Sequence, residues 1–290
     1  MRRALGSVRL RRGQVGLAIL VFTLLVAIIG PLLSPYTPTA IVGPPGQPPG
    51  QGLLLGTDYL GHDVLSRVLW GGWSVIWLAA AATALAHVIG LVIGLTAGYS
   101  RNWVDPVLMR GVDVILAFPP LLFFLIVATS VGTGELTLVV GIGIVLSPGV
   151  ARISYTATRE TATRAFVEAA VARGENTVAV MRREILPNIS GPIITNLGLT
   201  VTFAILLIAA VNFLNLGVQP PAANWALMVA ENRPVLSLNV WATIAPALMI
   251  ALLTIGVNLT TDAVAEALGR SGEEPVVPGL ERAPGELTVP

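Results

Sequence analysis

The side chains that most often carry chemistry in proteins are scarce in this chain. Its 290 residues include no cysteine, and all 17 basic side chains are arginine, so lysine is absent as well. Without cysteine there is no thiol nucleophile, disulfide or thiolate metal site. Without lysine the chain cannot form a lysine Schiff base, and it cannot complete a P-loop, in which a lysine reaches the terminal phosphates of a nucleotide. The two histidines, His62 and His87, are too few for a histidine-rich metal centre.

Other kinds of catalytic site are equally poorly supported. A membrane-embedded enzyme would need clustered His, Asp or Glu, or a serine beside a base. His87 and the scattered serines and threonines form no such constellation. We therefore expect no catalytic residue, metal site or cofactor on this chain, and we do not expect it to be an enzyme. Any chemistry that it depends on is expected to take place on a partner.

The elements that position these residues are expected to cross a membrane. Charged residues make up 11% of the chain, hydrophobic residues 54%, and the mean hydropathy is +0.79. A helix of roughly 20 apolar residues spans the bilayer core. The sequence predicts an all-α integral membrane protein with six transmembrane helices, at about residues 14–33, 72–100, 114–134, 136–151, 191–216 and 236–261.

The first of these stretches has a second interpretation. It follows a basic segment, residues 1–13, and a secretory signal peptide shows the same pattern. The apolar run is longer than a typical signal core, however, and prolines follow it where a small-x-small cleavage site would stand. We expect the stretch to remain as a membrane anchor.

The arginines predict the orientation. With the N-terminus inside, fifteen of the 17 arginines lie in inner segments, and only Arg67 and Arg233 lie outside. Because arginine is enriched in cytoplasmic loops, both termini are expected in the cytoplasm. Between residues 14 and 270, the six-helix domain then has an outer segment at 34–71, which includes a Pro/Gly-rich linker, and a cytoplasmic loop at 152–190. The tail, residues 271–290, is expected to be disordered.

The cytoplasmic loop has the pattern of two short helices. Phe166, Val167, Ala170 and Val171 share one helical face, with Arg164, Glu168 and Glu175 elsewhere. Gly174 suits the left-handed conformation that ends a helix, and Asn176 is a good cap for a second helix over residues 177–186 that stops at Pro187-Asn188. From the pattern alone, a pair of interfacial helices on anionic lipid and a docking site for a protein are equally supported.

The spacing within this loop resembles a known motif. Glu168-Ala169-Ala170, then Gly174, then Leu186-Pro187 is similar to the EAA loop of the membrane subunits of ABC-type importers. In that family the loop is a coupling helix that docks on a cytoplasmic ATPase. The resemblance implies an ATPase-coupling role for a set of residues that comprises Phe166, Glu168, Ala169, Ala170, Gly174, Glu175, Leu186 and Pro187.

Other stretches resemble one branch of that family, the peptide and nickel permeases of the binding-protein-dependent type. They are Leu55 to Asp58 with the residues up to Arg67, Asp113 to Pro119, and Phe213 to Pro221 with Trp225. The similarity covers about residues 14–270 and is typical of the second, C-type permease of these systems, which has the type I importer fold. His62, Trp73, Asn212 and Asn215 depart from the usual residues of the branch, which leaves the substrate open.

The resemblance implies a set of partners and a substrate class. The partners are a second homologous permease in a heterodimer, two ABC ATPases or one fused ATPase that bind ATP and Mg, an extracytoplasmic substrate-binding protein and membrane lipid, with no nucleic acid. The expected location is the bacterial inner membrane, with several spans. Short peptides, di- or oligopeptides, are the expected cargo. Nickel chelates or another small solute remain alternatives.

Further residues are candidates for the transport path or its outer mouth. Asn196, Asn212 and Asn215 could line the path or a gate, or could simply join helices. On the outer side, Asp58, Asp63, Arg67, Trp225 and Arg233 are available to a receptor, or they close the outer mouth. His87 is expected to bond to a neighbouring helix, Pro119-Pro120 to bend the third span, and Gly90 and Gly94 to allow close helix packing.

A self-sufficient secondary transporter is the competing class. Such a transporter couples transport to ions or protons through charged residues within its spans. The six predicted spans contain no Arg, Asp or Glu. The importer subunit is therefore favoured.

Overall fold

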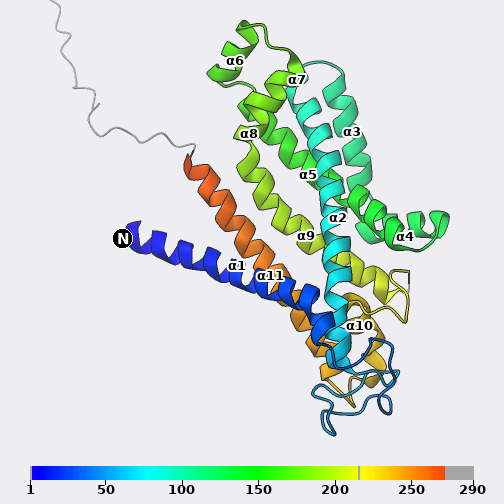
Figure 1. Cartoon of the computed structure of the whole chain (residues 1–290). Coiled ribbons are helices and arrows are strands. Elements are labelled where there is room, and N and C mark those ends of the chain that lie inside the picture. The colour runs from blue at the N-terminus through cyan, green and yellow to red at the C-terminus, as the bar shows by residue number, and fades with distance from the viewer. Residues whose placement is uncertain (1, 215, 272–290) are drawn as a thin grey trace, which may run out of the picture.

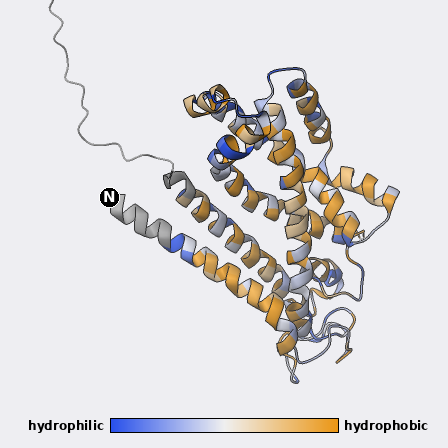
Figure 2. Ribbon diagram, turned by 45° about the horizontal axis from the view of Figure 1, so that its top comes forward, coloured by the Kyte–Doolittle hydropathy of each residue, from blue (hydrophilic) through white to orange (hydrophobic). Residues whose placement is uncertain are grey.

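The computed structural model describes residues 2–214 and 216–271, and every regular element within these ranges is a helix. Five helices are long and apolar enough to cross a membrane. They are α1 (Arg2–Leu33), α2 (Val64–Tyr99), α5 (Glu135–Thr161), α9 (Ser190–Phe213) and α11 (Trp241–Ser271). Within α1 the candidate span is Arg11–Leu33. Figure 2 shows them coloured largely as hydrophobic.

A sixth span is present if two bent helices count as one. α3 (Val104–Leu116) and α4 (Pro120–Val131) meet at an angle of 88°. Pro119 precedes α4 with an extended backbone, and Pro120 takes the first helical position, where its missing N–H does no harm. The expected interruption at Pro119-Pro120 is confirmed. The predicted span 114–134 is nevertheless not one helix, because it is broken between Leu116 and Pro120. Its first arm, α3, also begins ten residues before the predicted start, at Val104.

The long helices extend past several of the predicted spans. α2 begins at Val64 because Asp63 caps it, with its carboxylate accepting a hydrogen bond from the N–H of Ser66 at 2.8 Å. α5 continues to Thr161, beyond Arg152, since charged residues do not end a helix outside the apolar core. The predicted disorder of the tail concerns residues that, from 272 on, lie outside the described ranges.

α2 and α5 pack closely along most of their length. Gly90 and Gly94 face α5 as expected: a Cβ at Gly94 would lie 2.5 Å from the Cβ of Ser154 and 2.6 Å from the carbonyl oxygen of Ala151. Glycine is therefore required for this approach, and the interface follows the small-residue pattern of membrane helix pairs.

The molecule has two distinct ends (Figure 1). α10 (Trp225–Glu231), the 3₁₀ turn η2 (Arg233–Val235) and the segment 34–63 lie at one end, which we call the α10 end. α6 (Ala165–Ala172) and α7 (Thr177–Val180) lie at the opposite end, the α6 end. α1 and α11 run side by side between them. The main buried cluster joins α2, α5, α9, α10 and α11, and a second one lies beneath α6.

Candidate functional site

α6 ends in a glycine turn whose geometry agrees with the sequence prediction. Gly174 has φ +81°, in the left-handed region. Its N–H donates to the carbonyl oxygen of Val171 at 2.9 Å, and the N–H of Glu175 donates to that of Ala170 at 3.2 Å. These two bonds form a Schellman motif. A Cβ at Gly174 would meet no atom within 4 Å, so the backbone conformation alone calls for glycine here.

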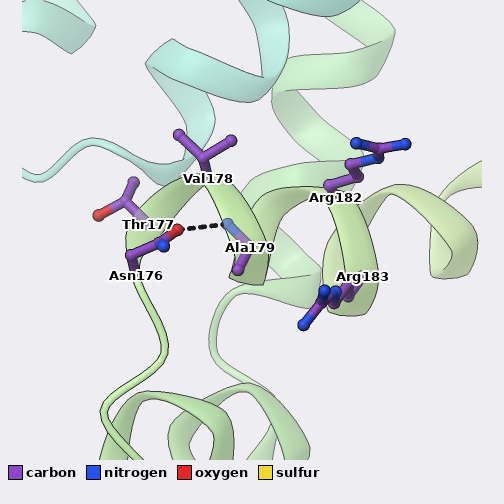
Figure 3. Close-up of a pocket in the computed structure, with 6 residues that line it drawn as sticks. All are labelled: Asn176, Thr177, Val178, Ala179, Arg182 and Arg183. Atoms are coloured by element: carbon purple, nitrogen blue, oxygen red, sulfur yellow. Dashed lines mark hydrogen bonds between the residues drawn. The ribbon is translucent and has the colours of Figure 1, made fainter.

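The chain then turns directly into α7. The side chain of Asn176 accepts a hydrogen bond from the N–H of Ala179 at 2.8 Å, as the predicted cap should. Figure 3 shows this bond beside a shallow hollow of about 760 Å³. Arg182 and Arg183 line the hollow, project in different directions and are exposed. The hollow thus presents positive charge at the α6 end.

One face of α6 holds it on the membrane helices. Val167 and Ala170 are buried in a cluster with Val180 and Ile185. Side chains of α2, α5 and the start of α9 pack against the same cluster, namely Leu91, Leu95, Tyr99, Ile153, Ala157, Ile189 and Ile193. α6 therefore shares one buried cluster with three membrane-spanning helices, and its own backbone lies mainly against α7 and the turn that follows it.

The opposite face of α6 is open. Glu168, Ala169 and Gly174 are exposed. The apolar face expected from the sequence is only half correct, because Phe166 is 36% exposed and Val171 is 51% exposed. An eight-residue helix that lies on a flat support buries a narrow stripe, and its flanking apolar residues remain outside. The exposed set combines a carboxylate, small residues and two large apolar side chains.

The second helical run ends at Asn188, as the predicted stop at Pro187-Asn188 requires, but it is not α-helical throughout. After α7 the chain forms a π-helical turn (Met181–Ile185) and the short helix α8 (Leu186–Asn188), and after Ile189 it enters α9. The N–H of Leu186 donates to the carbonyl oxygen of Met181, five residues back. This wide turn places Pro187 in a new first turn, where its missing N–H is tolerated. Leu186 is half-buried, and Pro187 is exposed.

At the α10 end, buried charges converge on one arginine. Arg67, near the start of α2, donates to Asp58 Oδ2 at 2.5 Å, to Glu231 Oε2 at 3.2 Å and to the carbonyl oxygen of Ala222 at 3.1 Å. Arg67 and Asp58 are almost completely buried, and Glu231 is nearly so. We call Asp58, Tyr59, His62, Arg67 and Glu231 the Arg67 cluster.

The two carboxylates of the cluster have opposite pKa shifts. For Asp58, burial acts to raise the pKa, but hydrogen bonds from Arg67 and His62 and the charge of Arg67 outweigh it and lower the pKa. For Glu231, burial raises the pKa above the usual value of 4.5, and Arg67 only partly offsets it. Asp58 is thus the principal counter-ion of Arg67. His62 donates or accepts through Nδ1 at 2.9 Å from the same carboxylate.

Most residues expected to face a receptor do not form exposed surface. Asp58, Asp63, Arg67 and Trp225 are buried. The indole N–H of Trp225 donates to the carbonyl oxygen of Val68 at 2.7 Å, which fixes α10 on α2. Asp58 bonds to Arg67 and Asp63 to Ser66, whereas Arg67 and Trp225 also bond to residues more than 150 positions away, so the polarity of all four serves internal contacts. Arg233 is exposed and stacks on Phe213, with 3.7 Å from its Cζ to the ring centroid.

The candidate path residues also differ in their burial and in the contacts that they make. Asn212 is buried, and its side-chain oxygen accepts from the N–H of Val218 at 2.8 Å, which secures the turn after α9. Asn196 is half-buried and bonds to Thr200 within the same helix. Asn215 lies outside the described residues. His87 Nδ1 lies 3.0 Å from the carbonyl oxygen of Thr83 in its own helix, and the imidazole also interacts with the backbone of Ile193 in α9, in line with the expected bond to a neighbouring helix.

Sequence reasoning missed Tyr59, Glu231, Arg182 and Arg183. One signal was available for Glu231, which is the only acidic residue between Glu184 and Asp262. An isolated charge in such a stretch calls for a partner. Within the described part of the chain, no three His, Cys, Asp or Glu side chains are grouped so as to hold a metal ion.

Two family models match the chain. The first, described as binding-protein-dependent transport system inner membrane component, covers residues 90–271. The second, described as the N-terminal TM domain of oligopeptide transport permease C, covers residues 9–50. Together they include both ends of the molecule and most of the long helices.

Curated relatives match over most of their length. The di/tripeptide transport system permease protein DppC of Pseudomonas aeruginosa is 33% identical over 260 residues, which is 87% of this chain and 86% of the relative. The dipeptide transport system permease protein DppC of Bacillus subtilis is 32% identical over 255 residues, or 87% and 80%. Among solved structures, an inward-facing MetNI methionine ABC transporter chain shares the fold, with a TM-score of 0.59, 16% identity and coverage of 71% and 96%.

Proposed function

The chain belongs to the family of binding-protein-dependent transport system inner membrane components, and from that premise we propose that it is a permease subunit of an ATP-driven importer of short peptides. The chain is a multi-pass inner membrane protein with the fold of type I ABC importer permeases. Relatives named for dipeptide and di/tripeptide transport align with nearly nine-tenths of it, which favours the same substrate class. Nickel chelates and other small solutes remain the alternative cargo.

The observation that carries the proposal is the two-sided seating of α6. Its buried side, Val167 and Ala170, belongs to a cluster that includes side chains of α2, α5 and α9, while Glu168, Ala169 and Gly174 stay exposed. A partner that pushes on the exposed side therefore acts on a cluster that α6 shares with three membrane helices. Ala169 and Gly174 present no bulk to an approaching backbone, and Glu168 supplies one charge that fixes the position of the partner.

The partners follow from this arrangement. Two cytoplasmic ABC ATPases, or one fused ATPase, bind ATP and Mg and act on α6. A second homologous permease completes the translocation path, and an extracytoplasmic binding protein delivers the peptide at the α10 end. The α6 end and both termini then face the cytoplasm, in agreement with the arginine distribution.

Co-purification and uptake test this function. The tagged chain, solubilised from its own membrane, is expected to bring down a second permease and ATPases. In proteoliposomes, the complex with its binding protein should accumulate labelled dipeptide only when ATP is supplied on the cytoplasmic side of the complex. Excess unlabelled dipeptide should compete with this uptake, and a nickel chelate should not. Isolation of the chain without an ATPase under mild conditions would contradict the proposal.

Orientation has its own test, because the chain contains no natural cysteine. A cysteine in place of the exposed Arg173 should react with an impermeant maleimide only in inside-out vesicles. A cysteine in place of Leu54, which is exposed at the α10 end, is the matched control and should react only in intact cells. The opposite pattern would reverse the proposed topology.

A further inference from the structure

The Arg67 cluster joins three separate parts of the α10 end through one side chain. Arg67 belongs to α2, Asp58 to the segment 34–63 and Glu231 to α10, and the carbonyl oxygen of Ala222 lies in the connection that leads into α10. The partners of Arg67 are up to 164 residues away in sequence. Only the folded arrangement of all these parts brings them together.

Additional buried hydrogen bonds join the same parts. The side-chain oxygen of Asn232 accepts from the N–H of Tyr59 at 3.0 Å. The side-chain amide of Asn239 donates to the carbonyl oxygens of Leu55 at 2.8 Å and Thr57 at 3.0 Å. Asn232 and Asn239 are buried. The segment 34–63 is therefore attached to α10 and the turn after it by hydrogen bonds from two buried asparagine side chains.

Separation of these parts would be costly. A buried arginine and a buried carboxylate that lose each other keep their desolvation penalty without the attraction that offsets it. The amide groups of Asn232 and Asn239 would lose bonds in the same way. We do not expect a motion that opens and closes in every transport cycle to use such a junction as its hinge, whereas motion of the whole group leaves every bond intact.

We propose that the segment 34–63, the first turns of α2 and the stretch from Ala222 to Asn239 form one outer unit that moves as a single body during transport, with Arg67 as its positioning residue. Because α10 cannot leave α2, a displacement of α2 that starts at α6 is transmitted directly to the outer mouth. The inference rests on the proposed function for the existence of a transport cycle. It goes beyond that function in assigning how the outer side moves.

A reversible cross-link tests the single body directly. The ideal Cβ of Gly46 lies 3.2 Å from the Cβ of Leu238, slightly inside the usual disulfide range, and the pair connects the segment 34–63 with the turn after η2. Gly46 has φ +70°, so a cysteine there strains the backbone in the oxidised and the reduced sample alike, and the test compares only these two samples. In the G46C/L238C chain, oxidation should leave ATP-driven dipeptide uptake within about twofold of the reduced sample. Thiol titration of the same sample confirms that the bond has formed. A reversible arrest of uptake on oxidation would overturn the proposal.

The role of Arg67 is tested by rescue. Arg67→Gln should lower uptake about tenfold or more in a complex that still assembles, and oxidation of G46C/L238C in that background should restore most of the loss. A role of Arg67 in contacting substrate or receptor would not be rescued by a cross-link elsewhere. Normal uptake by Arg67→Gln, or absence of rescue in an assembled complex, would contradict the assignment.

A labelling experiment covers the case in which Arg67→Gln fails to fold. Ala226 is 1% exposed inside the outer unit, whereas Ala222 is exposed and contributes only its carbonyl oxygen to Arg67. Ala226→Cys should resist an aqueous maleimide with or without ATP, while Ala222→Cys should react in both conditions. Reaction of Ala226→Cys during ATP turnover would show that the unit opens. If wild-type uptake is absent, the proposed function fails, but the labelling without ATP still reports whether the unit is closed.

Discussion

The principal charged side chains are buried at one end of the molecule and exposed at the other. At the α10 end, Arg67 and Asp58 are buried and bonded to each other. At the α6 end, Glu168, Arg182 and Arg183 are exposed. Charges that are satisfied inside the chain hold its parts together, whereas charges left at the surface are available to another molecule. The position of a charge in the fold, more than its presence in the sequence, thus separates a structural group from a docking group.

The ends also differ in how their contacts are distributed along the chain. The turn at Gly174 and the cap at Asn176 use residues three to five positions apart. The bonds of Arg67 to Ala222 and of Tyr59 to Asn232 connect residues 155 and 173 positions apart. Local contacts let the turn after α6 form independently of the rest of the fold. Long-range contacts make the α10 end depend on the whole fold.

The largest effect is expected from Asp58→Asn. The substitution leaves Arg67 buried without its principal counter-ion, and breaking a buried pair in this way costs about 3–5 kcal/mol. The apparent melting temperature of the chain in detergent should fall sharply, or the yield of folded protein should collapse.

Asp113→Asn is the matched control for that loss. Asp113 pairs with Arg152 between α3 and α5, but the two side chains are 39% and 47% exposed. An exposed pair contributes about 0–1 kcal/mol, so this variant should melt close to the wild type. Equal losses in both variants would remove the distinction between buried and exposed charge on which the comparison depends.

Gly174→Ala should give the next largest effect, at the opposite end. A Cβ has free space there, but alanine in the left-handed region costs about 1–2 kcal/mol. Because the contacts of α6 are local, the cost should weaken the turn and not the whole fold. The amount of peptide taken up per ATP hydrolysed should fall several-fold, while membrane insertion and the melting temperature stay nearly unchanged.

The control is Gly149→Ala in α5. A Cβ at Gly149 also meets no atom within 4 Å, and its backbone has no positive φ. This variant should couple ATP hydrolysis to uptake normally. Uncoupling by Gly149→Ala to the same degree would show that the glycine turn has no special role.

Glu168→Arg should affect function without affecting stability. Glu168 is exposed, and in the described residues α6 is seated through Val167 and Ala170 on its other side. We expect normal melting but weaker co-purification of the ATPase and lower uptake. Glu160→Arg makes the same change of charge at an exposed position at the end of α5 and should leave both properties intact. Normal ATPase binding by Glu168→Arg would place the docking surface elsewhere.

The same contrast explains how much could be predicted from the sequence. The apolar stretches, the bend at Pro119-Pro120, the turn at Gly174 and the cap at Asn176 depend on neighbouring residues, so local patterns were sufficient. The helical run from Thr177 ends at Asn188, within the predicted stop at Pro187-Asn188, but the π-helical turn inside it could not be predicted, because no neighbouring residue identifies it. The burial of Asp58 and Arg67 depends on α10 and the connection into it, more than 150 residues away. That burial could not be predicted from the neighbouring residues.

The smallest effect is expected from Glu231→Gln, which tests whether the two carboxylates of the Arg67 cluster differ as their pKa shifts indicate. The pKa of Glu231 is raised by burial, so the folded state holds its proton more tightly than the unfolded chain does. The resulting stability is present below the usual value of 4.5 and is lost as the pH rises through the raised pKa.

Glutamine is neutral at every pH and can still accept a hydrogen bond from Arg67 or Tyr59. Glu231→Gln should therefore melt at or slightly above the wild-type temperature at neutral pH and should lose the gain that the wild type shows on mild acidification. Asp58 has a lowered pKa, and its contribution is lost only as the pH falls through that lower value, so the two effects separate along the pH axis. A strong loss of stability in Glu231→Gln at neutral pH would mean that both carboxylates are essential counter-ions of Arg67.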